Sequence, residues 1–456
     1  MARGITDQQT DLDQLIEEEE RRFVDRQPRS RALGERAERS LAGGVTSSWQ
    51  IHRPQPVWID RGAGSRVWDV DGNEYVDLHG GYGVNAVGHA HPAIVRAVSD
   101  RVRRGTHFAQ PTEDAIVVAE DLARRFGLPL WRFANSGTEA TMDAVHLMRA
   151  VTGRSRIVKI EGAYHGHHDS VQVSVYQPVE QLGPAHRPWG APASTGIPRE
   201  IVELTSIVPF NDPEPLEAIF AERGPEIAGM IMEPVMMNAG IIPPVSGYLD
   251  RVREITRRHG ALLAFDEVKT GFTIGPGGAT ASLGVTPDIV CLAKAMGGGV
   301  STAAIGGTED VMARVTSGDY EQVGTFNGNP LAVAAARAAL TEVLTPEAYE
   351  HFERLRTGMV AGCEAAIARH PVRGHVVALG AKGCIVFADH PIRNYREFLE
   401  IDDRFSHLHW LIQHNGGVFL PPWGKAEQWM LSVQHTEDDV ARFVENFERF
   451  AEAVAP

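Results

Sequence analysis

The pattern that most constrains this chain is a series of short apolar segments, separated by helical segments, between residues 130 and 292. The apolar segments are predicted strands, which cover Leu130–Ala134, Ile157–Ile160, Ile227–Met232, Ala261–Phe265 and Ile289–Leu292. Helical patterns lie between them, for example over residues 138–151 and 248–258. Apolar strands that alternate with helices indicate a mostly parallel α/β sheet covered on both faces. Ligands of such sheets bind beyond the carboxyl ends of the strands.

The two ends of the chain have a different pattern. Charged helices are predicted at about 11–24 and 30–41, and three short strands at 57–59, 66–69 and 74–78. Asp71-Gly72-Asn73 predicts a hairpin turn between the last two strands. An Ala-rich helix starts near Leu331, and the chain ends with a helix over 437–454. We therefore predict a large α/β domain at 101–335. Residues 1–100, with helices and a small sheet, and the C-terminal α+β part at 336–456 form a smaller domain.

Composition and charge argue against several classes of protein. The chain has 44 Lys and Arg against 59 Asp and Glu, a net charge of −15, which argues against nucleic acid or an anionic membrane as partner. No apolar run reaches the roughly 20 residues of a membrane-spanning helix, and the N-terminal segment does not resemble a secretory signal. The three cysteines are far apart and form no CxxC, so neither a disulfide framework nor a cysteine zinc site is expected. We expect a cytoplasmic protein with reduced thiols.

Two motifs follow predicted strands and could bind an anion or a cation. Ser136, Gly137 and Thr138 open a helix directly after a strand, where backbone N–H groups and hydroxyls suit a phosphate. Asp266 and Glu267 end the strand that begins near Ala261, so one carboxylate can face a ligand. Taken alone, each motif is explained as well by an ordinary helix cap or a solvated acid.

Two further motifs follow the other strands. Lys294 stands between an apolar strand and three glycines, and a lysine in a dry pocket becomes a nucleophilic amine. The alternative is a surface lysine that extends its ammonium into water. The segment 164–169, Tyr-His-Gly-His-His-Asp, fits either a metal or an aromatic ring stacked on a flat ligand. We expect no metal, because no matching carboxylate and histidine pair stands elsewhere at ligand spacing.

The order of these motifs favours one interpretation. A phosphate turn, an aromatic residue, a strand-end carboxylate and then a lysine together make a pyridoxal phosphate site. The segments that carry this order are NSGTEATM, AYHGHHD, EPVMMNAG, FDEV, LAKAMGGG and GTFNGNP. With them the sequence resembles the class III aminotransferases of fold type I over nearly its whole length, and within them the glutamate-1-semialdehyde aminomutase branch. The resemblance implies a large, mostly parallel α/β/α cofactor domain and a smaller α+β domain built from both termini.

The resemblance also implies roles for individual residues. Lys294 would form a Schiff base with pyridoxal 5′-phosphate and move the proton between substrate and cofactor. Asp266 would pair with the protonated pyridine nitrogen. The ring faces would meet Tyr164 and Val268, the phenolic oxygen would meet Asn238, and the phosphate would meet Ser136, Gly137 and Thr138. Thr325 would reach the phosphate from a neighbouring subunit, which implies a homodimer with a shared active site.

One departure from the aminomutase pattern affects the predicted substrate. Gln50 stands where the aminomutases have an arginine that grips the substrate carboxylate, and a neutral amide cannot make that bidentate contact. The other candidate substrate residues are Ser47, Trp49, Trp423 and Glu427, with His52, Arg53 and Lys425 as substitute carboxylate partners. The irregular segment 177–198 resembles the aminomutase gating loop and suggests a mobile lid.

We therefore favour a transaminase that moves an amino group from an amino acid or amine donor to a keto or aldehyde acceptor. A glutamate-1-semialdehyde 2,1-aminomutase, an isomerase that transfers the amino group within one molecule, is the first alternative. A non-catalytic homologue that binds pyridoxal phosphate is the second.

Overall fold

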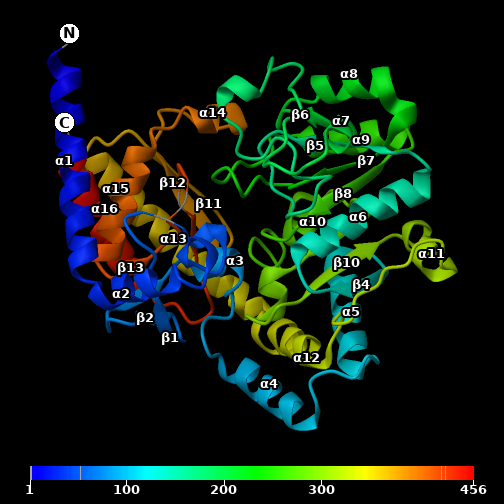
Figure 1. Cartoon of the computed structure of the whole chain (residues 1–456), viewed down its shortest axis with the longest axis horizontal. Helices are drawn as coiled ribbons and strands as arrows, with labels where there is room; N and C mark the ends of the chain where they lie inside the picture. The colour runs from blue at the N-terminus through cyan, green and yellow to red at the C-terminus, as the bar shows by residue number, and fades with distance from the viewer. Residues whose placement is uncertain (1–2, 52, 423, 427, 456) are drawn as a thin grey trace. The chain divides into compact units, whose positions relative to one another are not determined.

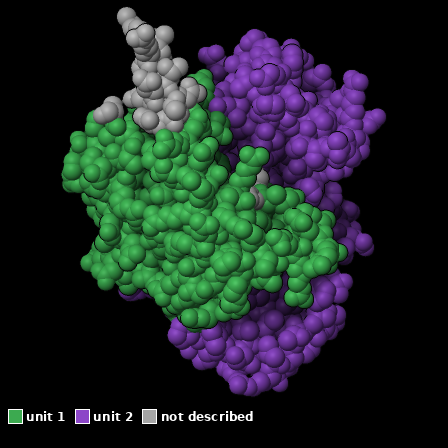
Figure 2. All heavy atoms as spheres, turned by 60° about the vertical axis from the view of Figure 1, so that its left-hand side comes forward, with its two compact units in different colours: residues 1–91, 350–391, 400–456 green, residues 92–349, 392–399 purple. Residues whose placement is uncertain are grey.

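The computed structural model describes residues 3–51, 53–422, 424–426 and 428–455. The chain divides into two compact units, shown in Figure 2. Unit 1 contains residues 1–91, 350–391 and 400–456, and unit 2 contains residues 92–349 and 392–399. Every residue of unit 2 is described. The domain boundaries drawn from the sequence, at 100 and 335, stay a prediction.

Unit 2 is built on a seven-stranded sheet in the order β4-β10-β9-β8-β7-β5-β6 (Figure 1). The strands are β4 (Leu130–Ala134), β5 (Arg156–Ile160), β6 (Thr205–Val208), β7 (Ile227–Met232), β8 (Leu262–Asp266), β9 (Ile289–Leu292) and β10 (Ala303–Gly307). Neighbouring strands from β9 to β6 are parallel, whereas β10 is antiparallel to both β9 and β4. The predicted mostly parallel sheet is confirmed, and the five predicted strands lie within a residue of the observed ones.

Helices surround this sheet and complete its core. Their bounds are α4 (Pro92–Arg104), α5 (Glu113–Phe126), α6 (Gly137–Thr152), α7 (Arg199–Glu203), α8 (Glu214–Arg223), α9 (Tyr248–Arg258), α10 (Gly278–Leu283), α11 (Glu309–Ser317), α12 (Pro330–Ala338) and α14 (Tyr395–Leu399). Helix α6 packs on β7, β9 and β10 and buries Ala140, Ala144, Leu147 and Met148 in the core. The strands β7, β9 and β10 are buried throughout, which explains why they are apolar at every position.

Unit 1 combines segments from both ends of the chain. One sheet has the order β1-β2-β3-β13 and another β11-β12-β14. Their strands are β1 (Ile59–Ala63), β2 (Arg66–Asp69), β3 (Glu74–Asp77), β11 (His375–Leu379), β12 (Lys382–Val386), β13 (Val418–Phe419) and β14 (Gln428–Met430). Because β13 pairs with β3, the N-terminal and C-terminal parts share a sheet, and the predicted smaller α+β domain from both termini is confirmed.

The two N-terminal helices of unit 1 begin earlier than predicted, the second ends at Ala37 and not at residue 41, and the C-terminal helix has the predicted bounds. The helices of unit 1 are α1 (Arg3–Asp25), α2 (Pro28–Ala37), α3 (Gly80–Gly83), α13 (Pro346–Arg369, which starts in unit 2), α15 (Asp403–Asn415) and α16 (Glu437–Val454). Helix α2 begins at Pro28 and not at residue 30, because proline suits the first helical turn. Helix α1 packs along α15.

The predicted hairpin between β2 and β3 is confirmed, and its turn has a clear physical basis. The two strands are antiparallel, and Gly72 has a φ of +90°, which other residues rarely adopt. The Asp69 carboxylate accepts hydrogen bonds from the backbone N–H groups of Asp71 and Asn73. The first predicted strand starts at Ile59 and not at residue 57.

Candidate active site

The predicted site residues of unit 2 follow strands whose carboxyl ends lie at one edge of the sheet. The strand pairs Ala134–Ala303, Leu292–Ala304 and Asp266–Cys291 align the ends of β4, β9 and β8. Residues that follow these ends, and those of β5 and β7, therefore meet at the same edge. They are Ser136 after β4, Tyr164 after β5, Glu233 after β7, Asp266 at the end of β8 and Lys294 after β9.

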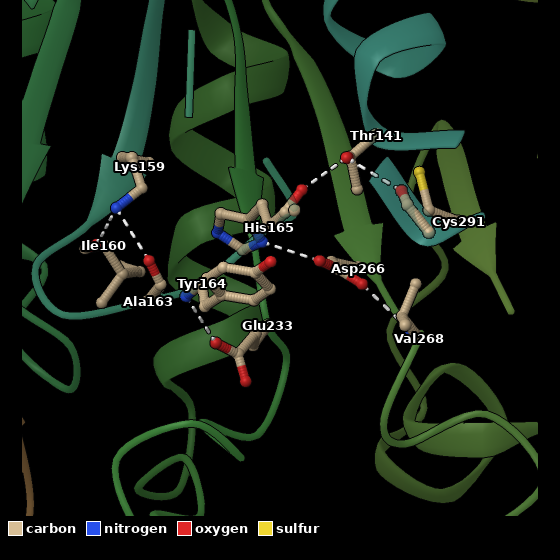
Figure 3. A network of polar contacts seen from close by, with 12 residues as sticks. Thr141, Lys159, Ile160, Ala163, Tyr164, His165, Glu233, Asp266, Val268 and Cys291 are labelled. Carbon is tan, nitrogen blue, oxygen red and sulfur yellow. Dashed lines mark hydrogen bonds and ion pairs between the residues drawn. The ribbon is translucent and has the colours of Figure 1, made fainter. Parts of the chain in front are cut away.

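Asp266 is held by two hydrogen-bond partners. Its side chain is 5% exposed, Oδ1 accepts from the Val268 N–H at 3.0 Å, and Oδ2 lies 2.8 Å from Nδ1 of His165 (Figure 3). His165 is buried, and its Nε2 has no hydrogen-bond partner among the described residues. No role of its own was predicted for His165 from the sequence. Its only signal was its place beside Tyr164, because the pairing with Asp266 joins residues 101 positions apart.

Lys294 is half-buried, and its backbone is strained. Its φ of +54° lies in the left-handed region, which costs a residue other than glycine roughly 1–3 kcal/mol and is typical of functional positions. Burial lowers the pKa of Lys294, and the carboxylates of Asp266 and Glu233 act in the opposite direction. The pairing of Asp266 with Cys291, three residues before Lys294, brings the segments of Asp266 and Lys294 to the same edge of the sheet.

Tyr164 and Glu233 form the neighbouring part of the site. The Tyr164 N–H donates to Oε1 of buried Glu233 at 3.1 Å, and Oε2 accepts from the Met237 N–H at 2.7 Å. Burial raises the pKa of Tyr164, and the charge of Asp266 raises it further, so the phenol keeps its proton at neutral pH. The Tyr164 ring stacks on Tyr176 with ring centroids 6.4 Å apart. Half-buried Asn238 follows Met237 in the same turn.

The N-terminus of α6 packs against the segments that carry these residues. Ser136 caps the helix by accepting from the Glu139 N–H at 3.2 Å. A Cβ atom at Gly137 would lie 2.9 Å from the Val268 side chain, so a glycine is needed for this close approach. The Thr138 hydroxyl accepts from the His167 N–H at 3.0 Å. The predicted phosphate turn thus lies next to Val268 and next to the segment that follows Tyr164.

Thr325 lies on the surface of the chain. Its neighbours Val323 and Phe326 are also exposed, by 79% and 57%. Asn327, two residues on, accepts from the Asn135 side chain at 2.9 Å, which ties this segment to the end of β4. An exposed threonine beside exposed apolar residues is compatible with the predicted contact to a second subunit.

Some of the candidate substrate residues of unit 1 lie within the described part of the chain, and others do not. The Gln50 Oε1 accepts from the N–H and the hydroxyl of Thr46, at 3.0 and 2.7 Å. Trp49 packs edge-on against Tyr82, with centroids 5.4 Å apart. Ser47 and Arg53 are exposed, and the Lys425 amine donates to the Ile401 carbonyl. Trp423, Glu427 and His52 lie outside the described residues.

The described part of the chain has neither a cluster of side chains suited to a metal ion nor a helix suited to crossing a membrane. No group of three or more His, Cys, Asp or Glu side chains there could hold a metal ion. None of its helices combines the length and the apolar character needed to cross a membrane.

Comparisons with known proteins show which family this chain belongs with. The family model Aminotransferase class-III matches residues 48–449. A glutamate-1-semialdehyde 2,1-aminomutase 2 from Exiguobacterium sibiricum is 39% identical over 417 residues, 90% of this chain and 94% of that protein.

Solved structures also resemble this fold closely. An omega-transaminase from Sphaerobacter thermophilus has a TM-score of 0.89 at 33% identity, covering 93% of this chain and 97% of that one. A glutamate-1-semialdehyde aminomutase from Pseudomonas aeruginosa PAO1, in complex with PMP, also has a TM-score of 0.89, at 30% identity over 98% of this chain and 99% of that one.

Proposed function

Because this chain belongs to the class III aminotransferases and is a pyridoxal-phosphate-dependent enzyme, we propose that it is a transaminase anchored to its cofactor by Lys294. Its donor would be an amino acid or an amine, and its acceptor a keto compound or an aldehyde. We favour a transaminase over an aminomutase because position 50 is a glutamine. Its side-chain oxygen accepts hydrogen bonds from the Thr46 N–H and hydroxyl.

The residues at the carboxyl edge of the unit 2 sheet fit pyridoxal phosphate. They provide an amine, a buried carboxylate, an aromatic ring and a helix N-terminus with two hydroxyls. The close approach of Gly137 to Val268, which a Cβ atom would prevent, keeps the helix N-terminus beside the carboxylate segment. When bound, the cofactor supplies a ring that withdraws electrons from the substrate α-carbon.

Lys294 and Asp266 would have the central roles. Burial favours the neutral amine of Lys294, which would anchor the cofactor and would hold the proton taken from the substrate α-carbon. The Val268 N–H and His165 would keep the Asp266 carboxylate in place as the partner of the ring nitrogen. Tyr164 would cover one ring face while keeping its own proton, and Val268 the other.

The remaining cofactor contacts would come from three segments. Asn238 would donate to the phenolic oxygen, and the phosphate would be bound by Ser136, Gly137 and Thr138. Thr325 of a second copy of the chain would complete the phosphate site, so the enzyme would work as a homodimer. Exposed Val323 and Phe326 beside Thr325 support this arrangement.

Gln50 distinguishes the two candidate reactions. An aminomutase needs a cation for the substrate carboxylate, and Gln50 offers only a neutral amide whose oxygen already accepts from Thr46. Trp49 and Tyr82 nearby would suit a less polar substrate group. We also propose a cytoplasmic location, supported by Cys291 and Cys363, which are buried thiols.

The first prediction tests this choice with two assays. Glutamate 1-semialdehyde supplied without an amino acceptor should yield little 5-aminolevulinate, whereas a screen of α-, β- and aromatic amino acids with keto acceptors should reveal an active donor. In the matched variant Gln50→Arg, kcat/KM for donors with a carboxylate near the Gln50 position should rise roughly tenfold, because a bidentate ion pair becomes available.

Two results would reverse the proposal. Rapid formation of 5-aminolevulinate by the unmodified enzyme would identify an aminomutase. Failure of every donor to convert the bound cofactor to its amine form would identify a non-catalytic homologue.

A further inference from the structure

Lys159 is a buried lysine near the end of β5, and the proposed function gives it no role. It is the second-last residue of that strand, and it is 0% exposed. Lysine is almost never fully buried unless it is paired, because its ammonium would lose its hydration. Contacts within the protein must therefore replace that water.

Three backbone carbonyls surround the Lys159 amine in place of water. Its Nζ donates to the carbonyls of Ile160 at 3.1 Å, Ala163 at 3.0 Å and Val173 at 2.8 Å, and Figure 3 shows the first two contacts. The ammonium of a lysine has three N–H donors, so three acceptors match its charged form. Hydrogen bonds to the charged form also favour that form.

Two carboxylates act on the charge of Lys159. Burial lowers the pKa of Lys159 to about 7, and the charges of Glu233 and Glu161 oppose this effect. Glu161 is occupied by Arg396, which donates to its two oxygens, both at 2.8 Å. Buried Glu233 instead accepts from the Tyr164 N–H at 3.1 Å.

A single peptide group connects Lys159 to Glu233. The Ala163 carbonyl and the Tyr164 N–H belong to the same peptide group, so its oxygen accepts from the ammonium and its N–H donates to the carboxylate (Figure 3). Hydrogen bonds to charged groups are shorter and stronger than those between neutral groups. Because a peptide group is planar and rigid, holding both ends fixes its plane and the position of the Tyr164 Cα.

The same ammonium also holds the neighbouring segment, which carries Tyr176. It binds the Val173 carbonyl, and the Gly162 N–H donates to the Ser174 carbonyl at 2.9 Å. Ser174 and Tyr176 have φ angles of +53° and +55°, a strained backbone that persists only where its surroundings hold it. The Tyr176 ring stacks on that of Tyr164. The ammonium therefore holds the backbone of both segments that carry this aromatic pair.

We propose that Lys159 is a positioning residue, which holds the Ala163–Tyr164 peptide group so that the Tyr164 ring covers one face of the cofactor. This inference rests on the proposed function, because that function assigns Tyr164 to a ring face. The alternative is a lysine that only stabilises the fold. The two differ in one respect, since a positioning residue changes cofactor binding through Tyr164 and a purely stabilising one does not.

The second prediction is a double-mutant cycle in the full-length protein. The dissociation constant of pyridoxamine phosphate, which binds without a bond to Lys294, is measured for Lys159→Met, Tyr164→Ala and the double variant. Tyr164→Ala should raise this constant roughly tenfold, the value of a stacked aromatic pair. Lys159→Met should raise it several-fold in the wild-type background, but less than about twofold in the Tyr164→Ala background.

Lys382 provides the matched control, because it is a buried lysine of β12 in unit 1 and is 2% exposed. Any effect of Lys382→Met on the dissociation constant should be the same in both backgrounds. A second measurement is hydrogen exchange at the Tyr164 amide, which should be about tenfold faster in Lys159→Met than in the wild type. If Lys159→Met does not fold, Lys159→Gln replaces it, because glutamine keeps a donor for one carbonyl.

The outcomes separate this inference from the proposed function. Equal effects of the Lys159 variant in the two backgrounds, or unchanged exchange at the Tyr164 amide, would overturn the inference and leave the role of Tyr164 intact. An unchanged dissociation constant in Tyr164→Ala would overturn both, because Tyr164 would then not contact the cofactor ring.

Discussion

Asp266 is the residue whose surroundings explain most about the site. It ends β8, it is buried, and its two oxygens are used by different partners, the Val268 N–H and the His165 ring. A buried carboxylate with such partners is held in one orientation. A charged group that is held in place can stabilise positive charge on a ring nitrogen without rearrangement during the reaction.

The third prediction concerns the charge and the position of the Asp266 carboxylate. Asp266→Asn keeps the size of the side chain but removes its charge, so the rate at which an amine donor is consumed should fall by roughly a hundredfold or more. His165→Ala keeps the charge and loosens the carboxylate, so its effect should be smaller. Single-turnover absorbance measurements check both. Equal losses in the two variants would mean that the position of Asp266, and not its charge, limits the rate.

At the scale of elements, helix α14 explains how the irregular segment 177–198 is held. Arg396 donates from two nitrogens to the two carboxylate oxygens of buried Glu161, both at 2.8 Å, and to the carbonyls of Leu182 and Gly183. The Tyr395 hydroxyl donates to the Gln177 carbonyl at 2.9 Å. This short helix belongs to unit 2 although its neighbours in the sequence belong to unit 1.

The fourth prediction concerns this anchor. Arg396→Ala leaves the Glu161 carboxylate buried without its ion pair, which should lower the free energy of unfolding by about 3–5 kcal/mol. Limited proteolysis should then cut within 177–198 faster than in the wild type. The matched control is Arg373→Ala, which breaks an exposed ion pair with Asp389 and should change neither property appreciably. Equal proteolysis of both variants would show that Arg396 does not hold the segment.

At the scale of the whole molecule, the two units are each assembled from separated parts of the chain. Strand β13 joins the C-terminal part to β3 within unit 1, and residues 392–399 return to unit 2. Two apolar residues of unit 2 that stand beside Thr325 are exposed in a single chain. Val323 and Phe326 are more exposed than most large apolar residues of a folded protein.

The fifth prediction is that this surface pairs two chains. The double variant Val323→Glu with Phe326→Glu should sediment as a monomer and lose cofactor during gel filtration, because a shared phosphate site would be broken. Thr325→Ala should stay dimeric and retain cofactor several-fold less tightly. A dimeric double variant, or unchanged cofactor affinity in Thr325→Ala, would argue against the shared site. Analytical ultracentrifugation and cofactor titration measure the two properties.

The sequence by itself determined the α/β class and the positions of five strands of the unit 2 sheet. It also showed the candidate site motifs that follow these strands. These features are local, because a strand buried on both faces must be apolar throughout and a cap or turn depends on a few adjacent residues. Strand β10 was missed because its residues, Ala-Ala-Ile-Gly-Gly, have weak strand propensity. Its glycines leave room for Trp131, since a Cβ atom at Gly306 would lie 2.6 Å from that ring.

Only the tertiary structure decided which distant side chains meet. It paired His165 with Asp266, Lys269 with the Met237 carbonyl and Arg396 with Glu161. Each pair joins segments that approach only after several strands have taken their order in the sheet, and no local pattern encodes that order. The chemistry of each site residue could thus be predicted from its neighbours in the chain. Its hydrogen-bond and ion-pair partners, in contrast, depend on the assembled sheet.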